Sequence, residues 1–90
     1  MTIQYDSHKN QSNIRKHGLS FQTASSAFDD PQAVIEFDED HSVNEERYNL
    51  IGAINDHIIF VVFTMRNETV RIISARPATK REIERYYGRK

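Results

Sequence analysis

Two short polar pairs, Asn55-Asp56 and Asn67-Glu68, constrain the fold more than any other feature of the sequence. Each pair separates two runs rich in β-branched and aromatic residues, and Asn and Asp are favoured in tight two-residue turns. Strands joined by such turns lie antiparallel and side by side. We therefore predict a three-stranded meander, with strands over residues 47–54, 57–66 and 69–76.

Two short helices are expected before the meander. Asp6 is a suitable N-cap for a helix through about residue 17, and Gly18 follows where a left-handed C-cap residue is needed. Ser20 can cap a second helix, in which apolar residues repeat at helical spacing until Pro31 stops it. This part of the chain therefore holds two helices in tandem.

One further helix and two short strands complete the predicted order of elements. Residues 2–5 and 33–37 have strand composition, and a last helix follows Pro77, with Thr79 and Glu82 spaced as a capping box. The order predicts an α+β fold with an antiparallel sheet of about four to five strands. We expect the two N-terminal helices and the C-terminal helix to cover one face of that sheet.

Two-residue turns also determine which side chains share a face of the sheet. One face is almost wholly apolar, so we expect the helices to cover it, each large buried side chain contributing roughly 1.5 to 3 kcal/mol. Arg76 falls on this same face at the end of a strand, and we expect it to have a structural role there. Ala75 falls on the opposite face. The apolar face comprises Tyr48, Leu50, Gly52, Ile54, Ile59, Val61, Phe63, Met65, Val70, Ile72 and Ser74.

Arginines gather at one end of the opposite face. The predicted pairing sets Arg47, Thr64 and Arg71 in one cross-strand row, with Arg66 diagonally beside it. Like charges side by side destabilise a sheet, so such a cluster needs an anionic partner. For the set we favour a phosphate, because each guanidinium offers a planar fork of donors to two phosphate oxygens. The alternative is neutralisation in ordinary surface ion pairs by Glu45, Glu46 or Glu68.

Charge is unevenly distributed along the chain. Residues 29–46 hold eight acidic side chains and no Lys or Arg, whereas residues 66–90 hold eight basic and three acidic ones, a balance of 8 − 3 = +5. The basic part suits a polyanionic partner. The chain has no cysteine, which excludes disulfides, thiolate metal sites and cysteine nucleophiles.

The length of 90 residues suits one domain, residues 1–90, with a thin core. The sequence shows neither the apolar core of a signal peptide nor an apolar run long enough to span a bilayer. We therefore expect a cytoplasmic protein without a membrane partner.

Several motifs, in order along the chain, resemble those of the BrnT toxin family. The two most specific are NIRKHGLSF at residues 13–21 and RIISAR at residues 71–76. Tyr5 departs from the family, which usually has Trp there, and this change affects packing more than chemistry. Further similar blocks, which together cover nearly the whole chain, are YDSHK (5–9), FDDP (28–31), ER (46–47), IG (51–52) and VVFTMR (61–66).

The resemblance implies a RelE-like fold and a ribonuclease that halts translation, the toxin of a type II toxin-antitoxin system. It also implies a partner, the BrnA antitoxin, which inhibits the toxin and carries a DNA-binding module. The substrate would be RNA. Operator DNA would be bound only through the antitoxin, and the complex would repress its own operon.

Cleavage of RNA without a metal needs a base for the 2′-hydroxyl proton, an acid for the leaving oxygen, and cations that stabilise charge on the phosphate. We assign phosphate stabilisation to Arg47, Arg66 and Arg71. His17 is the first candidate for proton transfer because histidine titrates near neutral pH, and Glu46, Lys9 and Tyr87 follow it. Residues expected to contact RNA are Lys9, Lys16, Thr64, Arg76 and Tyr87.

These assignments have structural alternatives. His17 precedes Gly18, where a cation interacts favourably with the end of a helix, and Lys9 can lie along a helix surface. We expect no metal and no cofactor, because the four histidines, His8, His17, His41 and His57, show no paired ligand spacing. The rival function class is a non-catalytic module that binds nucleic acid or an acidic protein.

Overall fold

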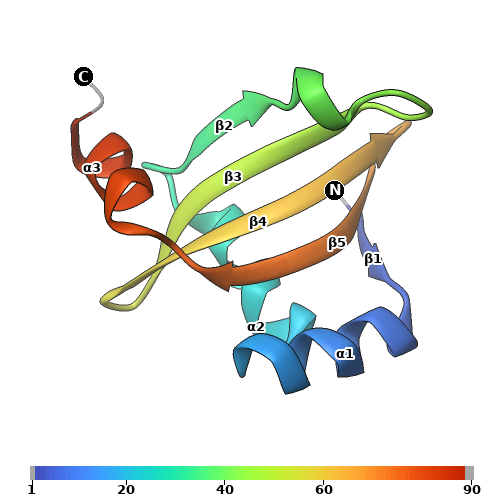
Figure 1. Ribbon diagram of the computed structural model, residues 1–90, viewed down its shortest axis with the longest axis horizontal. Helices are drawn as coiled ribbons and strands as arrows, with labels where there is room; N and C mark the ends of the chain where they lie inside the picture. The colour runs from blue at the N-terminus through green and yellow to red at the C-terminus, as the bar shows by residue number, and fades with distance from the viewer. Residues whose placement is uncertain (1, 89–90) are drawn as a thin grey trace.

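The computed structural model describes residues 2–88, which form an α+β fold with one five-stranded sheet in the order β1-β5-β4-β3-β2 (Figure 1). The strands are β1 (Thr2–Tyr5), β2 (Val34–Phe37), β3 (Arg47–Ile54), β4 (His57–Arg66) and β5 (Thr69–Pro77). The helices are α1 (Ser7–His17), α2 (Phe21–Ala24) and α3 (Lys80–Gly88), with 3₁₀ helices η1 (Ser25–Asp29) and η2 (Glu39–His41). Within residues 2–88, no helix has the length and apolar character needed to cross a membrane.

Both predicted hairpin turns are present. Asn55 and Asn67 adopt positive φ angles of 56° and 59°, a conformation that Asn tolerates better than most residues. β3 pairs with β4 through to Ile54 opposite His57, as a two-residue turn requires. The predicted meander of β3, β4 and β5 is therefore confirmed.

The sheet is mixed, so the expectation of a wholly antiparallel sheet was wrong. β1 pairs with β5 in parallel, with Tyr5 opposite Ile72. No turn joins these two strands, because β1 leads into α1 and β5 comes last in the sheet. Local sequence signals therefore say nothing about their relative direction.

A bulge in β5 changes the predicted register. Phe63 pairs with Ile72, but the preceding Val62 pairs with Ser74, so Ile73 has no partner on β4. One extra residue moves every later side chain of the strand to the other face. The run of apolar residues around the bulge contains no glycine or proline that would mark it in the sequence.

Three predicted positions at the end of β5 are corrected by this bulge. Ala75 lies in the hydrophobic core, not on the opposite face. Ser74 and Arg76 leave the core side, and Arg76 lies with its guanidinium carbon 4.2 Å from the centroid of the Phe60 ring. The rest of the predicted apolar face, up to Ile72, packs in or against the core, except Met65, which is 44% exposed.

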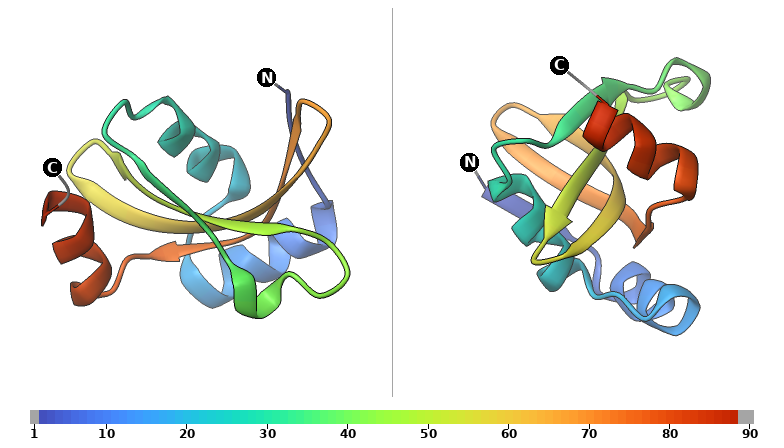
Figure 2. Two further views of the ribbon diagram at one scale, coloured as in Figure 1. Left: turned by 90° about the horizontal axis from the view of Figure 1, so that it is seen from above. Right: turned by 90° about the vertical axis from the view of Figure 1, so that its left-hand side faces the viewer.

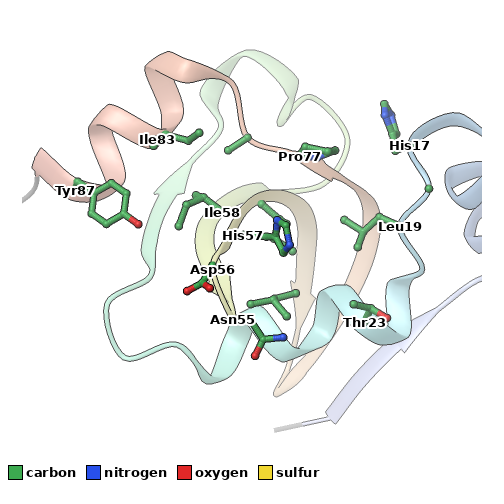
Figure 3. Close-up of a pocket in the computed structure, with 14 residues that line it drawn as sticks. His17, Leu19, Thr23, Asn55, Asp56, His57, Ile58, Pro77, Ile83 and Tyr87 are labelled. Carbon is green, nitrogen blue, oxygen red and sulfur yellow. The ribbon is translucent and has the colours of Figure 1, made fainter.

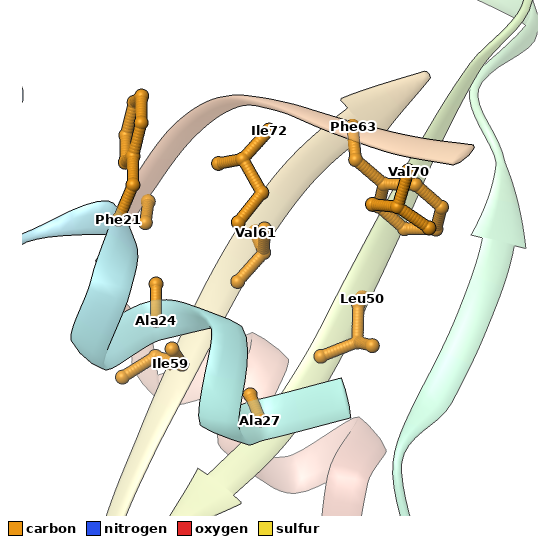
Figure 4. Close-up of a cluster of buried hydrophobic side chains, with 10 residues drawn as sticks. Phe21, Ala24, Ala27, Leu50, Ile59, Val61, Phe63, Val70 and Ile72 are labelled. Atoms are coloured by element: carbon orange, nitrogen blue, oxygen red, sulfur yellow. The ribbon is translucent and has the colours of Figure 1, made fainter. Parts of the chain in front are cut away.

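The hydrophobic core lies between the sheet and the segment formed by α2 and η1 (Figure 4). Phe21, Ala24 and Ala27 of this segment are fully buried. Gly52 permits the close approach, because a Cβ atom there would lie 3.1 Å from the carbonyl oxygen of Ala27. The sheet residues of the core, on what we name the core face, are Leu50, Ile59, Val61, Phe63, Val70, Ile72 and Ala75.

α1 packs against β5, the strand next to the edge strand β1 (Figure 1). Its predicted caps are confirmed: Asp6 accepts a hydrogen bond from the Lys9 amide at 3.0 Å, and Gly18 has a φ of 69°. The Asn13 carboxamide donates to the Ala75 carbonyl oxygen at 2.7 Å and accepts from the Ala75 amide at 3.1 Å. It thus satisfies backbone groups of β5 beyond the point where β1 ends.

α3 lies on the other side of the sheet from α2, so the three helices do not share one face (Figure 2). The contacts of α3 show this. Its Glu82 forms an ion pair with Arg76, and its Arg85 forms one with Glu36. Glu36 pairs with Asn49 and lies on the face away from the core. The prediction of one covered face was wrong because the second face is also apolar at this end, where Ile51 is fully buried.

Candidate functional site

The predicted arginine row is present at the end of the sheet away from the β3–β4 turn. Arg47 pairs with Thr64, Thr64 pairs with Arg71, and Arg71 pairs with Gln4 of β1. Arg66 stands two residues beyond Thr64 and therefore points to the same side. We name this surface, the part of the second face with Arg47, Asn49, Thr64, Arg66 and Arg71, the open face.

Two hollows of about 240 Å³ each border the arginine row. Arg66 and Glu45 line both of them. The remaining lining residues are Gln4, Thr64, Thr69 and Arg71 in one hollow, and His41, Val43, Asn44 and Arg47 in the other. The structure therefore brings together all three arginines that the sequence assigns to phosphate binding.

The counter-charge of the row is small. Oε2 of Glu45 lies 3.7 Å from Nη2 of Arg66, and the two side chains are 43% and 84% exposed, so this pair contributes little. Neither Arg47 nor Arg71 forms an ion pair with any other part of residues 2–88. The alternative of internal neutralisation thus holds for Arg66 alone, through Glu45.

Two polar atoms on the open face are buried without a hydrogen-bond partner, Nε of Arg47 and Oδ1 of Asn49. Leaving such an atom unpaired costs about 1 to 3 kcal/mol, and a functional role is one explanation for a buried polar atom that stays unpaired. Asn49 stands two residues after Arg47 and points to the same side. Sequence reasoning did not single it out, although a carboxamide within an apolar strand was a visible signal.

A second group of predicted residues gathers around α1. Lys9, Lys16 and His17 line a hollow of about 220 Å³ between α1 and β5, together with Ser74. This hollow shares no lining residue with the two arginine hollows. Seven of the ten predicted site residues therefore form two clusters, with His17 apart from the arginine row.

Arg76 is engaged within the fold. Its guanidinium donates hydrogen bonds of 2.8 and 2.9 Å to the two carboxylate oxygens of Glu82. Burial raises the pKa of Glu82. The hydrogen bonds from Arg76 and Thr79 and the charge of Arg76 together lower this pKa by more than burial raises it, so it lies below its ordinary value. The contacts of Arg76 are those of a structural residue.

Glu46 directly precedes Arg47 but lines neither arginine hollow, and Tyr87 lies on α3, away from the row. Glu46 accepts a hydrogen bond of 3.5 Å from the hydroxyl of Tyr48, a residue that packs against the core. Tyr87 is 64% exposed on α3 and lines a fourth hollow, to which His17 also contributes (Figure 3).

Potential metal ligands are sparse. Among residues 2–88, no three His, Asp or Glu side chains come together in a group that could hold a metal ion. His41 and Asp38 form a pair with Nδ1 and Oδ2 2.9 Å apart, in the loop beside one arginine hollow. Metal independence stays a prediction.

Comparison with known families is decisive for the class of protein. Residues 5–82 match the family described as ribonuclease toxin, BrnT, of type II toxin-antitoxin system. The chain belongs to the BrnT family. No curated protein matches the chain in sequence. Family membership makes this a ribonuclease toxin with an antitoxin protein as partner, and the resemblance seen in the motifs is confirmed.

The match to BrnT covers both clusters of predicted residues and ends at Glu82, so Tyr87 lies beyond it. Gln4 also lies outside the match, yet it stands beside Arg71 in one arginine hollow. Sequence reasoning missed Gln4 because only the parallel pairing of β1 with β5 brings it there. Glu45 was considered only as a neutralising charge, whereas it reaches both hollows.

Proposed function

We propose that this BrnT chain is an endoribonuclease with a RelE-like fold, which cleaves RNA without a metal ion and thereby inhibits translation. One observation carries the proposal: Arg47 and Arg71 flank Thr64 on the open face and have no acidic partner within residues 2–88. Guanidinium groups without counter-charge attract phosphate oxygens. Arg66, only weakly paired with Glu45, adds a third cation.

In the proposed reaction, the 2′-hydroxyl oxygen of RNA attacks the adjacent phosphorus while a base takes its proton. The bond from phosphorus to the 5′-oxygen breaks, and an acid protonates that oxygen. The products are a 2′,3′-cyclic phosphate and a 5′-hydroxyl. Negative charge grows on the phosphate oxygens in the transition state, so Arg47, Arg66 and Arg71 stabilise this state more than the bound substrate.

For proton transfer we keep His17 and Glu46 as candidates and add Glu45. Glu45 lines both arginine hollows, whereas the carboxylate of Glu46 is bound to Tyr48. His17 lies in the hollow beside α1, where Lys9 and Lys16 extend the cationic surface for the RNA backbone. Of the other predicted RNA contacts, Thr64 lies within the row, whereas Arg76 and Tyr87 lie outside it.

The proposal extends to partner and place of action. The antitoxin is of the BrnA type, and it neutralises the toxin by binding it. Operator DNA is bound only through the antitoxin, so the complex represses its own operon. Toxin and RNA substrate meet in the cytoplasm, and no membrane takes part.

The first experiment incubates purified, antitoxin-free protein with RNA in EDTA and identifies the ends of the products. We expect cleavage that leaves a 2′,3′-cyclic phosphate. Intact RNA with folded protein, in EDTA and in Mg²⁺ alike, would instead favour the non-catalytic binding module. Cleavage in Mg²⁺ alone would show that metal independence is wrong.

The second experiment replaces the arginines by alanine one at a time. Arg47→Ala and Arg71→Ala are each expected to slow cleavage by about 10²-fold, since each removes a charge that stabilises the transition state. Arg66→Ala should have a smaller effect because Glu45 offsets its charge. Arg15→Ala is the matched control, as Arg15 is exposed on α1 and forms no ion pair within residues 2–88. Equal activity in all four variants contradicts the assignment.

A further inference from the structure

The fourth hollow, of about 620 Å³, lies at the end of the sheet away from the arginine row. The end of α1 with the link to α2, the β3–β4 turn, and the start of α3 with the link before it form its walls (Figure 3). It shares no lining residue with the two arginine hollows. Its aliphatic lining consists of Leu19, Ile54, Ile58, Ile59 and Ile83.

α3 carries more apolar surface than the fold covers. Tyr86 is 6% exposed, and its hydroxyl donates to Oδ2 of Asp30 at 2.6 Å. Ile83 and Tyr87, one helical turn apart, line the hollow instead, and Tyr87 is 64% exposed. A concave apolar surface of this size on a small protein marks a binding site.

Cationic side chains border this hollow on two sides. Lys16 precedes the lining residue His17 in the last turn of α1, and Lys80, between the lining residues Ala78 and Ile83, begins α3. Within residues 2–88, neither lysine forms an ion pair. Asp56 is the one carboxylate among the lining residues. A partner with apolar anchors and acidic flanks therefore complements the hollow and its border.

We propose that this hollow binds an amphipathic segment of the antitoxin, with apolar side chains in the hollow and carboxylates against the ends of α1 and α3. The inference rests on the proposed function, in which a BrnA-type antitoxin neutralises the ribonuclease. Because the hollow shares no lining residue with the arginine hollows, this contact anchors the antitoxin without itself covering Arg47, Arg66 or Arg71.

The test compares variants of the hollow for affinity to the purified BrnA-type antitoxin and for RNA cleavage in its absence. Ile58→Glu places a charge in the half-buried lining, and Ala78→Trp fills the hollow from the link before α3. Each is expected to weaken antitoxin binding by at least about 30-fold, the loss typical of a central anchor. Cleavage by the free variants should equal that of the wild type. The matched control is Ile35→Glu, at a 57% exposed position on β2, which should bind the antitoxin as the wild type does.

A charge variant tests the acidic flanks separately. Replacing Lys80 by Glu is expected to weaken antitoxin binding by about 10-fold and to reduce its dependence on salt. Thermal denaturation shows which variants fold. If Ile58→Glu does not fold, the antitoxin affinity of Ala78→Trp alone tests the proposed binding site.

Unchanged antitoxin affinity in folded Ile58→Glu and Ala78→Trp would overturn the inference. So would a free toxin dimer that these two variants dissociate without affecting the antitoxin, since the occupant is then a second copy of the chain. Loss of RNA cleavage with antitoxin binding intact would assign the hollow to RNA and overturn it too. A wild-type toxin that binds the antitoxin but cleaves no RNA contradicts the proposed ribonuclease mechanism. The effect of the hollow variants on antitoxin affinity can still be measured in that case.

Discussion

Arg76 and Glu82 join the end of β5 to the first turn of α3 through two hydrogen bonds, of 2.8 and 2.9 Å. The Glu82 carboxylate also accepts a hydrogen bond of 2.9 Å from the Thr79 amide, and the Arg76 guanidinium lies over the ring of Phe60. Glu82 therefore caps the helix and anchors it to the sheet at once. The bulge at Ile73 makes this possible, because it turns Arg76 toward the face where α3 lies.

Glu82→Gln is expected to lower the free energy of unfolding by about 1 to 3 kcal/mol, since a buried charge-assisted pair is lost and Arg76 keeps its charge. Urea denaturation at neutral pH measures the change. Glu68→Gln is the control, because Glu68 is exposed and forms no ion pair within residues 2–88. Equal stability of the two variants would show that the pair does not anchor α3.

The pH dependence of stability should follow the same carboxylate. Burial raises the pKa of Glu82, but its hydrogen bonds to Arg76 and Thr79 lower it more, so the folded pKa lies below that of the unfolded chain. The stabilisation is then fully present above the unfolded pKa of about 4.3 and is lost as the pH falls through the folded pKa. The free energy of unfolding should fall more steeply below about pH 5 in the wild type than in Glu82→Gln. Parallel curves would assign the acid sensitivity to other groups.

The parts of the fold that could be predicted from the sequence depend on local signals. Asn55 and Asn67 mark turns because their side chains suit positive φ, and Asp6, Ser20 and Thr79 cap helices within three residues of themselves. Two-residue turns then set the register that brings Arg47, Thr64 and Arg71 into one row. The site follows from the turns.

What could not be predicted depends on contacts between distant segments. The direction of β1, and with it the position of Gln4 beside Arg71, has no local determinant. The bulge at Ile73 lies within an apolar run that fits either register. The bulge places the side chain of Ala75 in the core. The backbone amide and carbonyl of Ala75 then form hydrogen bonds with the carboxamide of Asn13.

Asn13→Ala should be among the most destabilising single substitutions. The Asn13 carboxamide makes three hydrogen bonds of 2.7 to 3.1 Å to backbone groups of Leu19 and Ala75. Its removal leaves buried amide and carbonyl groups unpaired, at a cost of about 2 to 4 kcal/mol. Thermal denaturation measures the loss, and hydrogen exchange should show reduced protection of the Ala75 amide. Asn44→Ala, in an exposed loop, is the matched control and should change stability by less than about 0.5 kcal/mol.

Glu45→Gln should separate RNA binding from RNA cleavage. Glu45 is the acid that offsets Arg66 and the carboxylate that reaches both arginine hollows. Removal of its charge should strengthen binding of RNA by about two- to five-fold at low salt, because phosphate no longer competes with the carboxylate. Binding is measured with an RNA whose 2′-hydroxyl groups are replaced by hydrogen, so that no nucleophile is present. If Glu45 is the base, cleavage of ordinary RNA by the same variant slows by about 10²-fold or more although binding is tighter. Faster cleavage together with tighter binding would show that Glu45 only tempers the charge of the arginine row, and would return the role of base to His17 or Glu46.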